Sequence, residues 1–121
     1  MKVIIAGSRK IDSYDCVLGV VANSGFKITE VVSGAAKGVD SIGEEIAYNF
    51  GIPVVSFPAE WDKYGKAAGH IRNEQMAKYA DALIAIWDGR SPGTKHMITV
   101  AKKLGLQVYL EVLDASNYRI S

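Results

Sequence analysis

The sequence is poor in several features that would assign it to a familiar class of protein. It has a single cysteine, Cys16, so it cannot form an internal disulfide, which favours a reducing compartment. Its 14 basic and 13 acidic residues leave a net charge of +1, so no general positive field favours nucleic acid as a partner. No apolar run approaches the length of a membrane span, and no leader pattern follows Met1. We therefore expect a cytoplasmic protein without a membrane partner.

Complete signatures of the common nucleotide-binding and metal-binding sites are also missing. The chain contains neither a G-x-G-x-x-G sequence nor a Walker sequence, so neither an ordinary dinucleotide fold nor a P-loop NTPase is supported. The two histidines, His70 and His96, lack the neighbouring ligands that a metal site needs. We therefore expect no bound metal and no cofactor.

What the sequence does contain is a regular alternation of strand-like and helix-like segments. The expected strands are short, mostly apolar runs at residues 2–6, 27–33, 54–57, 82–87 and 107–112. A first helix is expected from Asp12 or Ser13 to about Asn23. In the second helix, Ser41 and Glu44 have the spacing of a capping box.

The second half of the chain continues this pattern after one interruption. Residues 58–69 form the longest stretch without a clear period, which is expected to be either a binding loop or a solvated excursion. A helix carrying Ile71 and Met76 then precedes the fourth strand, and another carrying Ile98 and Leu104 precedes the fifth.

This order of elements predicts an α/β fold. Strands that alternate with single helices imply right-handed crossovers and a parallel sheet covered on both faces. We expect a three-layer Rossmann-like domain over residues 1–112, with a mostly parallel five-stranded sheet of order 3-2-1-4-5 and helices on both faces. Residues 113–121 are expected to be a tail or an edge extension.

The most informative stretch is the loop of small residues at 33–40. It joins a predicted strand to a predicted helix, where unpaired backbone N–H groups and the helix dipole favour an anion. Gly34 and Gly38 would let a ligand approach the backbone, although the same residues could simply make a tight turn. In the predicted sheet, the loops at 7–9 and 88–94 flank the point where the strand order reverses, and the loop at 33–40 lies beside them.

These loops define a candidate ligand site. Backbone amides and hydroxyls would bind phosphate oxygens, and Asp40 or Asp88 would accept ribose hydroxyls, although Asp40 could instead cap a helix. Arg9 and Arg72 are expected to clamp a phosphate or carboxylate, the alternative being salt bridges to nearby acids such as Asp12 or Glu74. Trp61 or Tyr64 could cover a base. The predicted ligand-binding residues are Gly7, Ser8, Arg9, Ser33, Gly34, Ala35, Lys37, Gly38, Asp40, Arg72, Asn73, Asp88, Ser91, Gly93 and Thr94.

Taken in this order, the loops resemble the SLOG superfamily of Rossmann-like ligand-binding domains, and in particular its small YspA/YpsA-related proteins. The resemblance rests on Gly7-Ser8-Arg9, the loop at 33–40, Arg72-Asn73 and the segment Ser91-Pro92-Gly93-Thr94, and it covers roughly residues 1–112. It implies binding of a nucleotide or a nucleotide-derived signal. More distant relatives are the DNA-processing protein DprA and the LOG phosphoribohydrolases, which cleave N-glycosidic bonds.

One departure from the LOG pattern bears on catalysis. LOG enzymes carry a P-G-G-x-G-T-x-x-E loop whose glutamate is catalytic, whereas this chain has Met97 at that position. A thioether cannot take up a proton or stabilise an oxocarbenium-like centre. His96 is the only nearby substitute base, and it is expected to be a solvated residue at a helix start. No catalytic residue is therefore assigned.

The sequence favours a sensor or carrier of a nucleotide-derived small molecule, and homo-oligomerisation is left open. One alternative is an N-glycosidase acting on nucleoside 5′-monophosphates through another carboxylate, such as Asp88, Asp40 or Glu60. A second is a DprA-like binder of single-stranded DNA, which the balanced charge disfavours.

Overall fold

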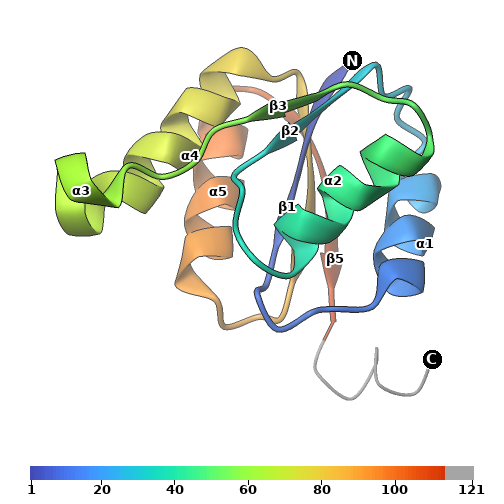
Figure 1. Cartoon of the computed structure of the whole chain (residues 1–121), viewed down its shortest axis with the longest axis horizontal. Coiled ribbons are helices and arrows are strands. Elements are labelled where there is room, and N and C mark those ends of the chain that lie inside the picture. Colours follow the sequence, from blue (N-terminus) through green and yellow to red (C-terminus); the bar gives the residue numbers. More distant parts are fainter. Residues whose placement is uncertain (114–121) are drawn as a thin grey trace.

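The computed structural model describes residues 1–113, and the predicted tail at residues 114–121 lies outside the described residues. The elements alternate almost throughout, as Figure 1 shows. In chain order they are β1 (Lys2–Gly7), α1 (Tyr14–Ser24), β2 (Glu30–Ser33), α2 (Val39–Asn49), β3 (Val54–Ser56), α3 (Trp61–Tyr64), the 3₁₀ turn η1 (Gly65–Ala67), α4 (Ala68–Tyr79), β4 (Ala82–Trp87), α5 (Pro92–Lys103) and β5 (Gln107–Val112).

The five strands within residues 1–113 form one parallel sheet in the order β3-β2-β1-β4-β5, as the sequence predicted. The central strand β1 is buried on both faces, so its side chains supply two separate cores. Val3 and Ile5 pack in the core beneath α1 and α2, whereas Ile4 and Ala6 pack in the core beneath α4 and α5. This period-two division explains why the strand reads as a continuous apolar run.

The start of α2 differs from the prediction. The Ser41–Glu44 capping box is wrong, because α2 begins at Val39 and its N-cap is Gly38, which makes no side-chain capping bond. Instead, the Glu44 carboxylate on α2 accepts a hydrogen bond from the hydroxyl of Ser33, the last residue of β2. The Val39 N–H donates to the carbonyl of Ser8 at 3.3 Å, which anchors the helix start to the loop after β1.

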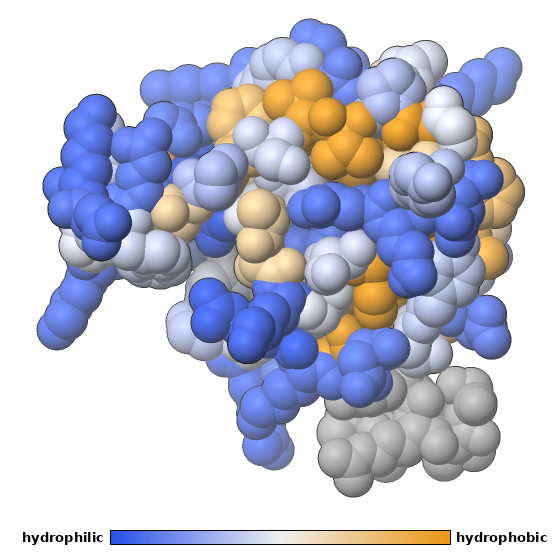
Figure 2. All heavy atoms as spheres, viewed as in Figure 1, coloured by the Kyte–Doolittle hydropathy of each residue, from blue (hydrophilic) through white to orange (hydrophobic). Residues whose placement is uncertain are grey.

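Residues 58–69 also differ from the prediction of an irregular loop. They contain α3 and η1, and α4 begins at Ala68, so residues 61–67 form a helical arm that leads into α4 (Figure 1). None of the arm's residues is buried, so no apolar period marks these helices in the sequence. Hydrophilic side chains cover most of the arm in Figure 2. Within residues 1–113, no helix is both long and apolar enough to cross a membrane.

Candidate functional site

A cavity of about 290 Å³ opens at the carboxyl end of β1, where the strand order reverses between β1 and β4. This is the place where open α/β sheets bind their ligands. The end of β1, the start of α2, the middle of α4 and the start of α5 all contribute to its wall. The lining residues are Ala6, Gly7, Arg9, Ala36, Asp40, Arg72, Asn73, Met76, Ser91, Pro92, Gly93, Thr94 and Met97.

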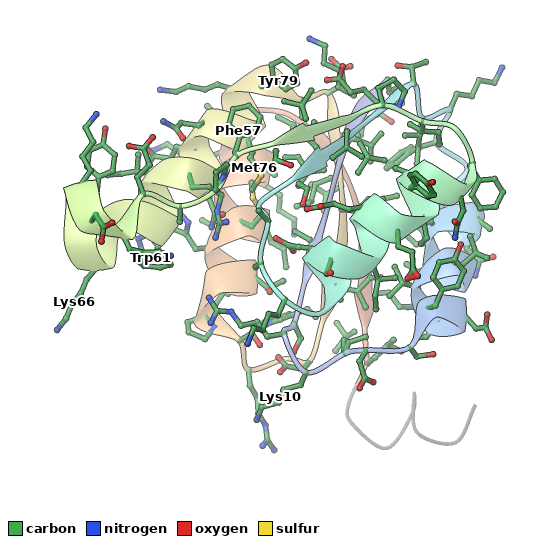
Figure 3. All side chains as sticks on the ribbon, in the orientation of Figure 1. Lys10, Phe57, Trp61, Lys66, Met76 and Tyr79 are labelled. Atoms are coloured by element: carbon green, nitrogen blue, oxygen red, sulfur yellow. The ribbon has the colours of Figure 1, made fainter. Side chains whose placement is uncertain are left out.

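A second cavity of about 300 Å³ adjoins the first and shares three of its lining residues, Arg9, Ala36 and Arg72. Its remaining wall comes from the loop after β2 and from the segment before α4, and consists of Gly34, Ala35, Lys37, Pro58, Ala59 and Trp61. Figure 3 shows Trp61 at the arm, near the start of α4. The two guanidinium groups therefore lie where the two cavities meet.

Arg72 and its neighbour Asn73 hold the two sides of the first cavity together. Arg72 is half-buried, and its Nη1 donates to the carbonyl of Gly34, while its Nε donates to Asn73 Oδ1 at 3.0 Å. Asn73 Nδ2 in turn donates to the carbonyl of Gly93 at 3.3 Å. A single turn of α4 thus contacts both the loop after β2 and the first turn of α5.

Gly34 is required at its position by close approach. A Cβ atom there would lie 2.5 Å from Arg72 Nη1 and 2.8 Å from Asp40 Oδ2, both far inside van der Waals contact. Only glycine leaves room for the guanidinium and the carboxylate to flank the backbone together.

Asp40 is the buried acid of the site, with 5% of its surface exposed. Burial raises its pKa from 3.8 to about 6, although the charge of Arg72 and backbone hydrogen bonds from Ala36 and Gly7 act in the opposite direction. The same burial lowers the pKa of Arg72, and the negative charge of Asp40 opposes that shift. The helix-cap alternative for Asp40 is wrong, since Gly38 is the N-cap.

Asp88 is the second acid, and it organises the loop before α5. Its Oδ1 accepts from the N–H groups of Arg90 and Ser91 at 2.9 and 2.7 Å, and its Oδ2 accepts from the hydroxyls of Ser8 and Ser91 at 3.1 and 3.0 Å. Partial burial raises the pKa of this carboxyl, but the hydrogen bonds outweigh it and lower the value to about 2. Because the Ser91 hydroxyl turns to Asp88, it does not cap α5.

The model of the YspA, cpYpsA-related SLOG family matches residues 1–64. The chain belongs to this family. The gene 61 protein of Mycobacterium phage D29 is 32% identical to this chain, and the match covers 88% of this chain and 93% of that protein.

The fold of this SLOG protein also resembles a solved structure, that of DNA processing protein A (DprA) from Streptococcus pneumoniae. The TM-score is 0.72 at 21% sequence identity, and the match covers 90% of this chain. The chain spans 49% of the DprA chain, so the likeness concerns about half of that protein. At this identity it establishes a common fold.

Most of the residues predicted for the SLOG site do converge on the two cavities. Those that line one or both are Gly7, Arg9, Gly34, Ala35, Lys37, Asp40, Arg72, Asn73, Ser91, Gly93 and Thr94. Four predicted residues, Ser8, Ser33, Gly38 and Asp88, line neither cavity. The Ser8 hydroxyl donates to Asp88, and the Ser33 hydroxyl donates to Glu44 on α2. A Cβ atom at Gly38 would lie 2.5 Å from the carbonyl oxygen of Ser8.

Sequence reasoning did not assign an apolar part to the wall, although it placed Met97 at the position of the catalytic glutamate of LOG enzymes. Met76 and Met97, each 1% exposed, face the first cavity from α4 and α5, together with Ala6 at the end of β1. Their signal was present, because Thr94 and Met97 are three residues apart and therefore share a helix face. Tyr64, considered as a cover for a base, lines neither cavity, whereas Trp61 lines the second. No group of three or more metal-ligating side chains comes together within residues 1–113.

Proposed function

We propose that this SLOG domain binds a nucleotide or a nucleotide-derived small molecule across both cavities, as a sensor or carrier. The observation that carries this proposal is that the two cavities meet at Arg9 and Arg72. An anionic group placed there would have the first cavity, lined by both polar and apolar side chains, on one side. On its other side it would have the second cavity, which is lined in part by Trp61. Together the two cavities are in the size range of small-molecule sites.

The phosphate would lie between the arginines and the start of α5. Arg9 is exposed and Arg72 is fixed by Gly34 and Asn73, so one guanidinium is adaptable and the other is preorganised. Gly93 and Thr94 line the same cavity in the first turn of α5, which no side chain caps. Uncapped N–H groups and the helix dipole both favour an anion at this position.

The second cavity suits a flat ring. Trp61 is 52% exposed and forms part of its wall, so one face is available for stacking. Lys37 adds a third positive charge to the same cavity, and no carboxylate lines it. A base would therefore stack here with its phosphates directed toward Arg9.

A thermal-shift screen of nucleoside monophosphates, cyclic nucleotides and ADP-ribose derivatives tests the proposal, followed by titration of the strongest ligand. A saturable increase in Tm is expected, because a ligand that binds only the folded state stabilises it. Arg9→Ala should weaken binding at least tenfold, about the contribution of one charge-assisted hydrogen bond. Lys103→Ala, which removes one exposed charge at the far end of α5, is the matched control. Equal affinity in both variants would contradict the proposed site.

A second candidate function is N-glycosidic hydrolysis, and the environment of Asp40 favours it. Asp40 is the carboxylate that lines the first cavity, and its pKa of about 6 suits general acid–base work near neutral pH. Glu60 lines neither cavity and Asp88 is engaged in its loop. Release of free base from nucleoside 5′-monophosphates, abolished in Asp40→Asn, would establish this activity and overturn the sensor or carrier proposal.

The same titrations can include a single-stranded oligonucleotide, because the structural neighbour DprA is named as a DNA-processing protein. Tight binding that falls steeply with salt would favour a nucleic-acid partner over a small molecule. The net charge of +1 leads us to expect weak binding.

A further inference from the structure

The two histidines of the chain lie against each other beside the first cavity. His70 on α4 and His96 on α5 are stacked, with ring centroids 3.7 Å apart and planes 6° from parallel. Neither ring lines a cavity. His96 is partly buried, so the expectation of a solvated residue at a helix start is wrong.

His96 is connected to the site through the side chain of Asn73. Asn73 Oδ1 accepts a hydrogen bond from Arg72 Nε at 3.0 Å, so this atom is the carbonyl oxygen of the amide. Asn73 Nδ2 is then the donor, and it lies 3.3 Å from the Gly93 carbonyl and 3.1 Å from His96 Nδ1. An amide nitrogen can only donate, so His96 Nδ1 must be the unprotonated acceptor and the ring proton must be on Nε2.

We propose that His96 is a positioning residue of the ligand site: its unprotonated Nδ1 orients the Asn73 amide, which orients Arg72, and protonation of His96 uncouples them. This inference rests on the proposed function, since Arg72 lies where the two cavities meet. A protonated Nδ1 is a donor that faces a donor, so Asn73 must rotate or the imidazole must move away. Rotation of the amide would present Nδ2 to Arg72 Nε, which is again a donor facing a donor.

The charged neighbours of His96 determine when this uncoupling occurs. Burial lowers the pKa of His96 most, the stacked His70 lowers it further, and Glu74 on α4 raises it. A positive charge on the parallel His70 ring at this distance disfavours a second positive charge on His96. The coupled arrangement is therefore the state at neutral pH, and it is lost at a pH below the ordinary pKa of histidine.

The coupling can be tested without any ligand by NMR of the ¹⁵N-labelled protein. At about pH 7.5 the His96 ring should be the Nε2–H tautomer, and the Arg72 Nε–H should be protected from exchange. As the pH falls, that protection should be lost with the midpoint of His96. An Nδ1–H tautomer of His96 would overturn the proposal. So would protection of the Arg72 Nε–H from exchange that does not change as His96 titrates.

Two substitutions separate the hydrogen bond from the charge. His96→Gln offers an oxygen that can accept from Asn73 without titrating, so protection of the Arg72 Nε–H should persist at low pH. His70→Phe keeps a stacked ring without its charge, so the His96 midpoint should move upward. Loss of Arg72 protection in His96→Gln at neutral pH, with the fold intact, would count against the proposal. If this variant does not fold, the tautomer and protection of the unmodified protein decide alone.

Binding of ADP-ribose is the second readout, because its diphosphate diester does not titrate in this pH range. Between about pH 7.5 and pH 5 the Kd of the unmodified protein should rise about tenfold more than that of His96→Gln, the effect of one lost charge-assisted hydrogen bond. Comparison with this variant removes the contribution of Asp40, which titrates in both proteins. Equal pH dependence in the two proteins would refute the positioning role. Failure of ADP-ribose to bind either protein would count against the proposed ligand class alone, because the NMR measurements judge the coupling separately.

Discussion

Replacing Asp40 by asparagine should remove a specific part of the pH dependence of the free energy of unfolding. The carboxyl has a pKa of about 6 in the folded protein against an ordinary value of 3.8, so between these values the folded state binds more protons than the unfolded state. Its contribution to stability is therefore complete below pH 3.8 and is lost as the pH rises through 6. At 1.36 kcal/mol per pKa unit, this corresponds to about 3 kcal/mol.

Urea denaturation of both proteins at intervals from about pH 4 to pH 7 measures this effect. The stability of Asp40→Asn relative to the unmodified protein should rise by about 2 to 3 kcal/mol across the range. Groups common to both proteins, including His96, cancel in the difference. Asp88 does not interfere, because its lowered pKa of about 2 places its loss of stability below this range. Asp62→Asn, which removes an exposed carboxylate, is the control. If the difference in the free energy of unfolding between the two proteins stays constant or falls with pH, the charge of Arg72 offsets the effect of burial on the pKa of Asp40.

Three further substitutions test other parts of the site. Gly38→Ala should lower the free energy of unfolding by several kcal/mol, because φ is +74° and the new Cβ would lie 2.5 Å from the Ser8 carbonyl oxygen. The control is Gly51→Ala, at φ +69° but with open space around the new Cβ, which should cost only about 1 to 2 kcal/mol. Equal denaturation midpoints for the two variants would refute the steric argument. Arg9→Lys should weaken nucleotide binding while leaving Tm almost unchanged, because Arg9 is exposed, and a lower Tm at full affinity would make it structural. Met97→Glu should destabilise the fold by several kcal/mol, because Met97 is 1% exposed and the new carboxylate would be buried. Met97→Leu, which keeps an apolar side chain of similar volume, is the control and should be tolerated. A Met97→Glu variant as stable as the unmodified protein would mean that the side chain at this position reaches solvent through the cavity.

The parallel sheet could be predicted because its three central strands, β1, β2 and β4, are buried on both faces. An apolar run such as that at residues 82–87 can be recognised as a strand without knowing its neighbours, and the helical connections between successive strands leave few possible topologies. The arm at residues 61–67 could not be predicted in this way, because it buries no residue and so leaves no apolar period.

The location of the site could be predicted, but not which of its side chains face the cavities and which hydrogen-bond to one another. The sheet order brings the loops after β1, β2 and β4 together whatever their side chains do. Which hydroxyls and carboxylates face the cavity depends instead on local competition for hydrogen bonds. Ser8 and Asp88 satisfy each other and thus line neither cavity, and Ser33 is engaged by Glu44. The role of Asn73 was also hidden, because its partners Gly93 and His96 lie 20 and 23 positions away in the sequence.

The two hydrogen bonds made by adjacent residues of α4, from Arg72 to Gly34 and from Asn73 to Gly93, have a consequence for how related sequences diverge. Gly34 precedes the arm and Arg72 follows it, so the first bond closes an interval that contains the arm. None of the arm's residues is buried, so added residues can extend into solvent without moving either end of that bond. Insertions and deletions should therefore accumulate at residues 58–67 during evolution. The interval between positions 73 and 93, in contrast, contains the buried strand β4, so its length should be nearly fixed across the lineage.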